Sequence, residues 1–226
     1  MIVTVMIPAH NEEASLGDVI RGIPRRFDGC KVRVLVVDDG STDRTAEVAK
    51  AGADFCLSLG TRRGLAKAFA AGMDRALEMG SDIIVNIDAD GQYDAGQIPD
   101  LIKPILHDEA DIVLGSRFKG WIEHMSSSKR IGNILMTRIT SFLAGVHFSD
   151  AQTGFRAISR DAAMRLNILG EYTYVQETLI QAAYKRLRIS EVPVSFRKRT
   201  AGESRLVSNL PGYALRAGMT MLQTYR

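Results

Sequence analysis

Two aspartates follow a strand-length apolar run near the middle of the chain. The run extends from Ile83 to Ile87, and Asp88 and Asp90 come directly after it with Ala89 between them. In an extended backbone, residues i and i+2 point to the same side, so the two carboxylates converge where the strand ends. Such a pair repels itself unless a cation lies between the charges. Hard oxygen ligands in small number suit Mg2+ or Mn2+ shared with substrate phosphates.

The two residues after this acidic pair support the same chemistry. Gly91 lets the backbone turn sharply, and Gln92 offers a neutral oxygen ligand within reach. Ligands of open α/β sheets bind beyond the carboxyl ends of the strands. We therefore expect a metal and diphosphate site at a sheet edge. A solvated turn is the alternative, because Asp and Gly are ordinary turn residues.

Acidic side chains also follow two other apolar runs. Glu12 comes after the first run, and Asp38 and Asp39 come after the second. Carboxylates accept hydrogen bonds from nucleobase edges and ribose hydroxyls, so these acids can hold a nucleoside while a metal holds its diphosphate. The chain contains neither G-x-G-x-x-G nor G-x-x-x-x-G-K-[ST], which removes the main support for a dinucleotide site or a P-loop. Acids at three strand ends predict a different kind of nucleotide binding.

The elements that must position these acids can be inferred from the hydrophobic pattern. Through residue 115, apolar runs of strand length alternate at short intervals with helical patterns. This alternation predicts a doubly wound, mainly parallel α/β sheet with right-handed crossovers, in which the acids share one edge. We expect strands at 2–7, 32–37, 55–59, 83–87 and 112–115, and helices at 14–26, near 46–49, at 65–79 and at 98–106.

The second half of the chain has a different pattern. Helices are expected at 128–143, 161–168 and 175–186, and an antiparallel strand is expected at 189–196. Residues 197–208 are polar and basic and are expected to form a mobile loop. Apolar residues at near-helical spacing in 210–225 predict an amphipathic helix that lies on a membrane surface or packs on the protein's own core. We therefore assign one domain at 1–208 and an amphipathic tail at 209–226.

The composition indicates a globular protein without its own membrane span. Of the 226 residues, 46% are hydrophobic and 24% are charged, and no apolar run reaches the roughly 18 to 20 residues that a span needs. The N-terminus lacks a basic region and a cleavage site, and Cys30 and Cys56 form neither a disulfide framework nor a metal motif. A cytoplasmic setting is therefore expected. The net charge of +3 gives no support for nucleic-acid binding, although the basic segment 185–205 should attract anions.

Six short motifs occur in order along the chain: Pro8-Ala9-His10-Asn11-Glu12, Asp38-Asp39-Gly40-Ser41-Thr42-Asp43, Asp88-Ala89-Asp90-Gly91-Gln92, Gly115-Ser116-Arg117, Thr153-Gly154-Phe155-Arg156 and Gly202-Glu203-Ser204-Arg205-Leu206. Together they resemble the motifs of family 2 glycosyltransferases, in the branch of polyprenyl-phosphate (dolichyl-phosphate) mannosyl- and glucosyltransferases. The resemblance covers about residues 2–206. It implies an α/β fold of the GT-A type, a Rossmann-like three-layer sandwich with a mainly parallel central sheet.

The same resemblance implies a reaction and its partners. A hexose would pass, with inversion, from GDP-mannose, UDP-glucose or UDP-N-acetylglucosamine to a polyprenyl phosphate. The enzyme would work at the cytoplasmic face of a membrane, through peripheral contact. The sugar, the nucleotide, the prenyl length and the oligomeric state are left open.

The resemblance further implies roles for individual residues. The metal, Mg2+ or Mn2+, would be bound by Asp90 and Gln92, with Asp88 and Ala89 against the ribose and diphosphate. The cations that gather the acceptor phosphate and the diphosphate would be Arg117, Arg130, Arg199 and Arg205. The residues that line the nucleoside site would be Pro8, His10, Glu12, Val37 and Asp39.

Two positions depart from the family pattern. Where many relatives carry an aromatic residue, this chain has His10, which leaves base stacking open, and Arg205 replaces a frequent lysine by a forked cation. Glu177 matches an acidic position of the branch and is a candidate near the sugar or acceptor, with an ordinary helix-surface glutamate as the alternative. Three further basic residues are interpreted as solvated: Lys129, Arg138 and Arg160.

The nature of the acceptor explains why arginines outnumber candidate bases. A phosphate monoester is already ionised near neutral pH and attacks unaided, whereas a hydroxyl acceptor needs a general base. The rival functions are a family 2 enzyme that glycosylates a sugar or protein hydroxyl, and a non-catalytic protein that binds a nucleotide sugar. The Q-x-x-R-W motif of processive synthases is absent, and no Gly-rich N-terminal loop followed by Arg and Lys supports a sugar nucleotidyltransferase.

Overall fold

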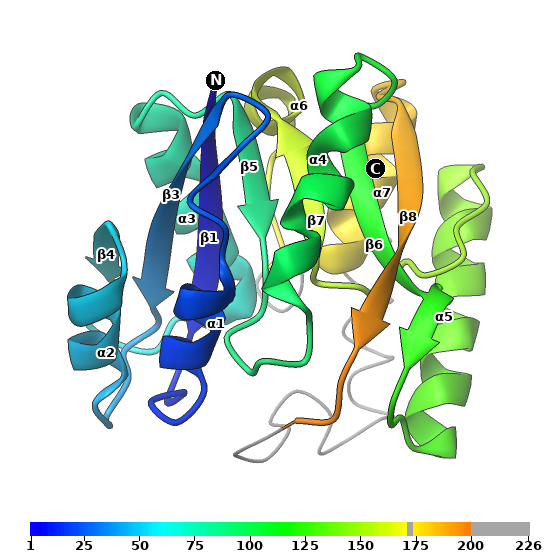
Figure 1. The fold of residues 1–226 in the computed structure, drawn as a ribbon. Helices are drawn as coiled ribbons and strands as arrows, with labels where there is room; N and C mark the ends of the chain where they lie inside the picture. The colour runs from blue at the N-terminus through cyan, green and yellow to red at the C-terminus, as the bar shows by residue number, and fades with distance from the viewer. Residues whose placement is uncertain (171–173, 200–226) are drawn as a thin grey trace.

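A mixed β-sheet forms the centre of the protein in the computed structural model, which describes residues 1–170 and 174–199 (Figure 1). The strands within these residues are β1 (Ile2–Ala9), β2 (Arg26–Phe27), β3 (Cys30–Asp38), β4 (Phe55–Ser58), β5 (Ile83–Asn86), β6 (Ile112–Ile122), β7 (Arg156–Ser159) and β8 (Ile189–Phe196). The helices are α1 (Leu16–Gly22), α2 (Thr45–Gly52), α3 (Leu65–Glu78), α4 (Ile98–Leu106), α5 (Ser127–Ala144), α6 (Arg160–Arg165), α7 (Val175–Tyr184) and the short 3-10 helix η1 (Ala95–Gln97).

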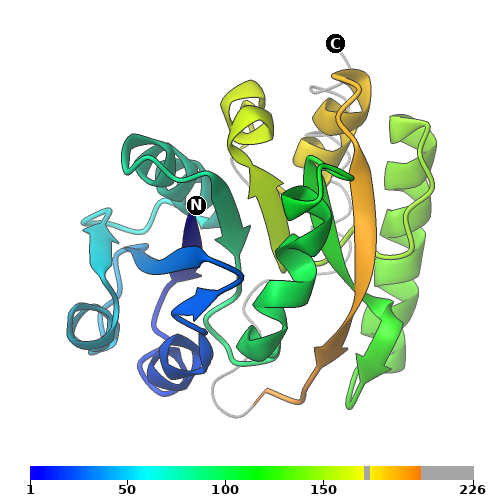
Figure 2. The same cartoon turned by 45° about the horizontal axis from the view of Figure 1, so that its top comes forward.

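Helices cover both faces of the sheet, which gives the expected three-layer α/β arrangement (Figure 1, Figure 2). On one face, α1 and α4 pack on a core that includes Val5 and Val34. On the other face, α3, α6 and α7 pack on a core that includes Met6 and Leu35. Consecutive strand residues point to opposite faces, so a strand covered on both sides must be apolar at every position. This requirement explains the continuous apolar runs of β1 and β3.

The strand order is β2-β3-β1-β5-β7-β6-β8, with β4 paired to β3. The expected antiparallel direction of β8 is wrong, because β8 pairs with β6 in parallel, from Ile112 beside Ile189 to Ile122 beside Phe196. Helix α7 returns the chain to the edge where β6 begins, so β8 must run in the same direction as β6 (Figure 1). The short β2 is antiparallel to β3, and β7 lies between β5 and β6 and is antiparallel to both. β7 was not expected, because it is four residues long and begins with the buried Arg156.

Three other boundaries differ from the expected ones. α1 ends at Gly22, well before residue 26, because Ile23 precedes Pro24 and takes an extended backbone with φ −76° and ψ 119°. β6 extends to Ile122, beyond a register shift after Ser116. α6 ends at Arg165, where residue 168 was expected. The remaining elements of the first half lie close to their expected positions.

The described part of the chain contains no helix that is both long enough and apolar enough to cross a membrane. Residues 200–226 lie outside the described residues. The expected loop at 197–208 falls largely there, and the expected tail at 209–226 falls there entirely. The domain boundary at residue 208 therefore stays a prediction.

Candidate active site

The parallel strands β1, β3 and β5 end at the same edge of the sheet (at the bottom in Figure 1). Ala9 at the end of β1 lies beside Asp38 at the end of β3, and Met6 lies beside Asn86 at the end of β5. The acids that follow these strands are therefore brought to one edge. These acids are Glu12, Asp38, Asp39, Asp88 and Asp90.

Asp39 fixes the loop that leads into α3. Its carboxylate oxygens accept hydrogen bonds from the backbone N–H groups of Arg63 (2.6 Å) and Gly64 (2.9 Å). Its carbonyl oxygen accepts a hydrogen bond of 2.9 Å from Nδ1 of His10, because a carbonyl can only accept. His10 and Asp39, two of the residues expected to line the nucleoside site, are thus joined by a hydrogen bond.

Pro8 and Val37 lie inside the strands that lead to this edge. Both are buried, and the Val37 side chain is 0% exposed in the core beneath α3. A nucleoside at the edge would therefore meet the backbone of Val37 and not its side chain. Both assignments stay predictions.

Asp88 and Asp90 form an interacting acidic pair beyond the end of β5. Burial, reinforced by the charge of Asp90, raises the pKa of Asp88 to about 7. Burial also raises the pKa of Asp90, opposed by a hydrogen bond of 3.0 Å from the N–H of Gln92 to its Oδ1 and by the charge of Arg199. Two partly buried carboxylates whose charges repel each other are an arrangement that a cation between them would stabilise.

The Asp88 carboxylate packs on the backbone of Gly154. A Cβ atom at position 154 would lie 2.7 Å from both carboxylate oxygens of Asp88. The carbonyl oxygen of Gly154 accepts a hydrogen bond of 2.7 Å from Nδ2 of Asn86, the last residue of β5. The glycine is therefore held beside the acidic pair, and its missing side chain leaves the space that Asp88 occupies.

Gln92 connects the acidic loop to the segment after β8. Its Nε2 donates to the carbonyl oxygen of Arg197 (3.1 Å), and its own carbonyl oxygen accepts from the N–H of Arg197 (2.7 Å). The side-chain oxygen Oε1 takes part in neither bond. This oxygen is the atom that could serve as a metal ligand.

Arg199 lies between two of the acids. Its Nη2 is paired with Oε1 of Glu12, and its Nη1 lies 3.8 Å from Oδ2 of Asp90. The guanidinium is 18% exposed, and so is the Glu12 side chain. The structure thus brings together Glu12, Asp90 and Arg199, three site candidates that are far apart in the sequence.

Arg117 is held by a buried partner that the sequence did not indicate. Its Nε and Nη2 donate to Oδ2 and Oδ1 of Asp150 at 2.7 and 2.9 Å, and its backbone N–H donates to Oδ2 at 3.1 Å. Asp150 is 0% exposed and Arg117 is 4% exposed. A bidentate pair of this kind fixes the plane of the guanidinium. Nη1 of Arg117 takes no part in the hydrogen bonds to Asp150, so it is the nitrogen that could donate to a ligand.

The interpretation of Lys129 as a solvated residue is wrong. Lys129 is half-buried, and its Nζ lies 5.6 Å from the centroid of the Phe196 ring. The Cζ of Arg117 lies 5.2 Å from the same centroid. Burial lowers the pKa of Lys129, as does the charge of Arg117, while Asp90 and Asp88 oppose the shift. The lysine amine therefore lies within the electrostatic reach of the acidic pair.

Arg130, the adjacent residue, has a different environment. It is exposed, and its Cζ lies 5.7 Å from the ring centroid of Phe118. The helical pattern alone does not distinguish positions 129 and 130, because both are basic residues near the start of a helix. The expected role of Arg130 in phosphate binding stays a prediction.

The alternative that Glu177 is a helix-surface residue is wrong. Glu177 is 0% exposed, and its two oxygens accept hydrogen bonds from the backbone N–H groups of Leu169 (2.8 Å) and Gly170 (3.0 Å). Burial raises its pKa, and these hydrogen bonds oppose the shift. Glu177 therefore positions the segment before α7, and its expected place near the sugar or acceptor stays a prediction.

Arg160 is also not solvated, because its Nη1 donates to the carbonyl oxygens of Leu77 (3.2 Å) and Ser81 (3.1 Å). Arg138 is exposed, as expected. Arg205 lies outside the described residues.

Within residues 1–170 and 174–199, no group of three or more His, Cys, Asp or Glu side chains could hold a metal on its own. The expected ligands, Asp90 and Gln92, therefore stay a prediction.

The pKa of Asp88 predicts how stability should respond to pH and to metal. The folded value of about 7 lies above the unfolded value of about 3.9, so ionising this group in the metal-free protein lowers its stability as pH rises from about 4 to about 7. A divalent cation binds the ionised pair. The increase in Tm caused by Mn2+ should therefore be larger at about pH 8 than at about pH 6, measured by thermal unfolding. An equal increase at both pH values would contradict the assignment of Asp88 to the cation site.

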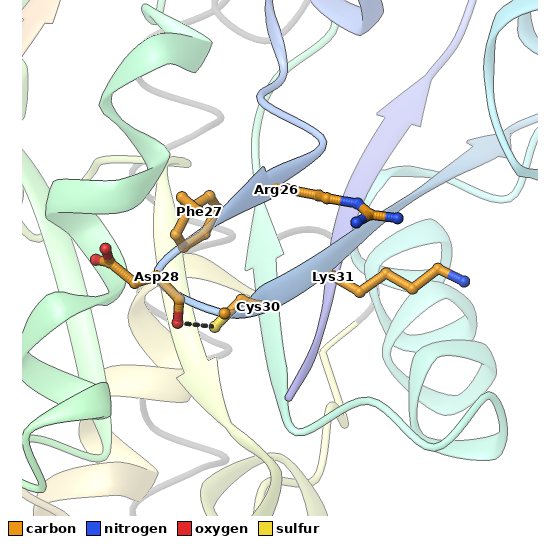
Figure 3. Close-up of a pocket in the computed structure, with 6 residues that line it drawn as sticks. Arg26, Phe27, Asp28, Cys30 and Lys31 are labelled. Carbon is orange, nitrogen blue, oxygen red and sulfur yellow. Dashed lines mark hydrogen bonds between the residues drawn. The ribbon is translucent and has the colours of Figure 1, made fainter.

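A pocket lies at the β2–β3 hairpin (Figure 3). It is lined by residues 26–31, which include Phe27 and Cys30. The Cys30 thiol donates to the carbonyl oxygen of Asp28 (3.8 Å), and burial raises its pKa. The pocket lies where β3 begins, at Cys30, whereas Asp38 is the last residue of β3. The pocket and the acids therefore lie at opposite ends of this strand. Cys30 is a packed thiol with no part in the acidic site.

The chain is similar in sequence to proteins named as dolichyl-phosphate glycosyltransferases. The chain is 32% identical over 219 residues to UDP-N-acetylglucosamine–dolichyl-phosphate N-acetylglucosaminyltransferase of Methanococcus voltae, covering 85% of this chain and 84% of the relative. It is 34% identical over 203 residues to the dolichyl-phosphate hexose transferase of Haloferax volcanii, covering 89% and 85%.

A solved structure shares the fold. Glucosyl-3-phosphoglycerate synthase from Mycobacterium tuberculosis, in complex with Mn2+, uridine diphosphate and glucosyl-3-phosphoglycerate, superposes with a TM-score of 0.77 at 24% identity, covering 99% of this chain and 79% of that one. The family model for glycosyl transferase family 2 matches residues 4–166. The chain therefore belongs to glycosyltransferase family 2.

Proposed function

We propose that the protein transfers a hexose, with inversion, from a nucleotide diphosphate sugar to a polyprenyl phosphate, in a reaction that depends on Mg2+ or Mn2+. The observation that carries the proposal is the acidic pair, Asp88 and Asp90, at the end of β5, with Arg199 3.8 Å from Asp90 and the Lys129 amine on the same side. Relatives named for transfer to dolichyl phosphate support the choice of acceptor.

The residues present fit a divalent cation shared with a diphosphate. Asp90 and Oε1 of Gln92 would hold it, and Asp88 would lie beside it against the ribose and diphosphate. When bound, the cation supplies charge stabilisation for the leaving diphosphate. Arg199, whose Nη2 is paired with Glu12 and whose Nη1 lies 3.8 Å from Oδ2 of Asp90, would contact a phosphate oxygen of the diphosphate.

The donor nucleoside would lie over the ends of β1 and β3. Glu12 and Asp39 offer carboxylate oxygens to the base and ribose, and His10 offers a ring that is held by its bond to the Asp39 carbonyl. Pro8 and the backbone of Val37 would complete the wall. The hydrogen bonds that Asp39 receives from Arg63 and Gly64 keep its carboxylate in place before any ligand arrives.

The acceptor phosphate would be held in line with the anomeric carbon by cations. The cations proposed for this task are Nη1 of Arg117, from β6, and Lys129 and Arg130, from α5. Arg205 is proposed from the resemblance alone. An ionised phosphate needs no general base, so the protein's part is to bring two anionic partners together and to exclude water. The protein would act from the cytoplasmic side, in peripheral contact with the membrane.

Lys129 should contribute more to catalysis than Arg130. Replacing Lys129 by Met removes a half-buried amine near the acidic pair, and we expect kcat/KM to fall about 30-fold, the range for one charge-assisted contact of about 2 kcal/mol. Arg130→Met, a charge loss at the next position on an exposed side chain, should cost about threefold. Steady-state rates at fixed metal concentration measure both. The reverse ranking would show that Arg130 swings into the site on ligand binding.

Incubation of the purified protein with labelled nucleotide sugars and a short polyprenyl phosphate tests the proposed function. GDP-mannose, UDP-glucose and UDP-N-acetylglucosamine are supplied separately, each with Mn2+ and with a chelator. Label should enter the lipid with one donor and only when metal is present. Absence of labelled lipid with all three donors would refute the acceptor, and binding of a donor without any turnover would favour a nucleotide-sugar-binding protein.

A further inference from the structure

Two buried polar side chains flank the acidic loop, residues 87–92, which carries Asp88 and Asp90. Asn86 is the last residue of β5 and comes two positions before Asp88, and Tyr93 comes three positions after Asp90. Asn86 is 1% exposed and Tyr93 is 5% exposed. Both side chains form hydrogen bonds to the same residue, Gly154, which lies 68 and 61 positions further along the chain. The two ends of the acidic loop are therefore attached to one point of the protein.

These bonds hold both polar groups of residue 154. Nδ2 of Asn86 donates to the Gly154 carbonyl oxygen (2.7 Å), and the hydroxyl of Tyr93 accepts from the Gly154 N–H (3.3 Å). The same hydroxyl lies 3.2 Å from Oγ1 of Thr153, to which it can donate its own proton. The Asp88 carboxylate packs on Gly154, because a Cβ atom there would lie 2.7 Å from both of its oxygens. Fixing residue 154 therefore fixes the surface against which Asp88 lies.

The amide of Asn86 has one orientation that suits its surroundings. A carbonyl oxygen can only accept, so Nδ2 must face Gly154, and Nδ2 also donates to the hydroxyl of Tyr174 (2.9 Å). Its Oδ1 is buried and has no hydrogen-bond partner in the part of the chain that the structure describes. A buried acceptor without a partner costs free energy that an apolar side chain of similar size would avoid. An asparagine at this position therefore fits a role that requires its donor.

The ring of Tyr93 is fixed by two aromatic neighbours. Its centroid lies 5.3 Å from that of Phe155 and 5.2 Å from that of Phe196, in tilted and edge-on arrangements. Aromatic pairs at these distances attract each other beyond the area that they bury. The hydroxyl is therefore in place before any ligand binds. Removing the hydroxyl alone would leave the packing of the ring intact.

We propose that Asn86 and Tyr93 are positioning residues, which hold Gly154 from the two ends of the acidic loop and thereby keep the carboxylates of Asp88 and Asp90 together for a divalent cation. Neither residue touches the cation or the substrate. The role of the cation rests on the proposed function, whereas the attachment of the loop to Gly154 is a property of the ligand-free protein. The two parts can therefore be tested separately.

Hydrogen exchange of the ligand-free protein tests the attachment. Asn86→Leu removes the donor at similar volume, and Tyr93→Phe removes only a hydroxyl. Each should speed the exchange of backbone amides in 87–92 and 153–155 at least about tenfold, while amides of β1 and β3 stay within about twofold. The matched control is Tyr174→Phe, which removes the other partner of the Asn86 amide and leaves both bonds to Gly154 in place. It should leave exchange in 87–92 within about twofold.

Titration with Mn2+ alone, followed by the paramagnetic resonance signal of the free ion, tests the consequence for the cation. The Kd should rise about tenfold in Asn86→Leu and about threefold in Tyr93→Phe, whose bond to residue 154 is longer. In Tyr174→Phe the Kd should stay within about twofold of the unmodified protein. Thermal unfolding of the two Tyr→Phe variants shows how much stability each lost hydroxyl contributes. A difference in Kd at similar stability separates positioning from general destabilisation.

Several results would overturn the proposal. Unchanged exchange in 87–92 in both Asn86→Leu and Tyr93→Phe would remove the attachment, and an equal effect of Tyr174→Phe would reduce both residues to core packing. A loop that exchanges faster with an unchanged Kd for Mn2+ would remove the link to the cation. If Asn86→Leu does not fold, Tyr93→Phe decides by the same criteria. An unmodified protein that binds no Mn2+ would refute the metal site of the proposed function, while hydrogen exchange would still decide the attachment.

Discussion

Replacing Asp90 by Asn should lower kcat/KM about 1000-fold and leave the fold intact. The amide keeps the shape of the side chain and can still accept the hydrogen bond from the N–H of Gln92. It loses the charge that holds a cation and that pairs with Arg199 at 3.8 Å. Losing charge stabilisation of the leaving diphosphate costs about 4 kcal/mol by analogy with other preorganised sites. Initial rates at saturating donor and a series of Mn2+ concentrations measure the effect.

Asp100→Asn is the matched control for this change. Asp100 lies on α4, is 61% exposed and pairs with Lys103, so its loss should change the rate less than threefold. Asp90→Asn should also flatten the dependence on Mn2+. A variant at position 90 that keeps more than a tenth of the activity with an unchanged metal dependence would exclude Asp90 as a metal ligand.

Gly154→Ala should lower kcat/KM about 100-fold through Asp88. The new Cβ atom would lie 2.7 Å from both carboxylate oxygens, so the carboxylate must move away from its position beside the ribose and diphosphate. Displacements of about 1 Å at a reacting site cost about 100-fold, and overpacking costs about 1–3 kcal/mol of stability as well. Rates and thermal unfolding, measured on the same preparation, separate the two effects.

Two comparisons decide whether this loss passes through Asp88. Gly22→Ala places its Cβ 3.5 Å from the Cβ of Ala95, an ordinary van der Waals contact, and should be neutral. In a background of Asp88→Asn, Gly154→Ala should cause little further loss, because neighbouring residues that act on one contact are not additive. Full additivity of the two substitutions would show that Gly154 acts on something other than Asp88.

Much of the fold followed from the sequence because its signals are local. Apolar runs such as Ile2–Ile7 report burial on both faces of a sheet, and the acids after them mark the carboxyl edge. The direction of β8 could not be derived in this way, because an apolar strand has the same pattern in either direction. The strand β7 was hidden by its length and by Arg156, whose guanidinium bonds four backbone and side-chain oxygens inside the protein.

The side chains that the sequence misjudged depend on contacts between distant segments. Arg117 could be named from its motif, but its partner Asp150 lies 33 positions further along the chain. Lys129 differs from Arg130 only in the direction that the first turn of α5 gives each side chain. Glu177 looks like a surface residue in the helical pattern, yet it is buried because the backbone at Leu169 and Gly170 folds over it.

The environment of Asp88 bears on a rival reaction. Burial raises the pKa of Asp88 to about 7, and a carboxyl group in that range is suited to act as a general base toward a hydroxyl acceptor. A bound cation would lower that pKa and remove the base. The two reactions therefore differ in whether the acceptor must already carry a negative charge.

Competition between a short polyprenyl phosphate and the polyprenol of the same length measures this difference directly. With one labelled donor and Mn2+, label should enter the phosphate lipid and leave the polyprenol unlabelled, since two anionic partners must be held together by cations and no base is present. Transfer to the polyprenol at a comparable rate, lost in Asp88→Asn, would contradict the phosphate acceptor and establish Asp88 as the base.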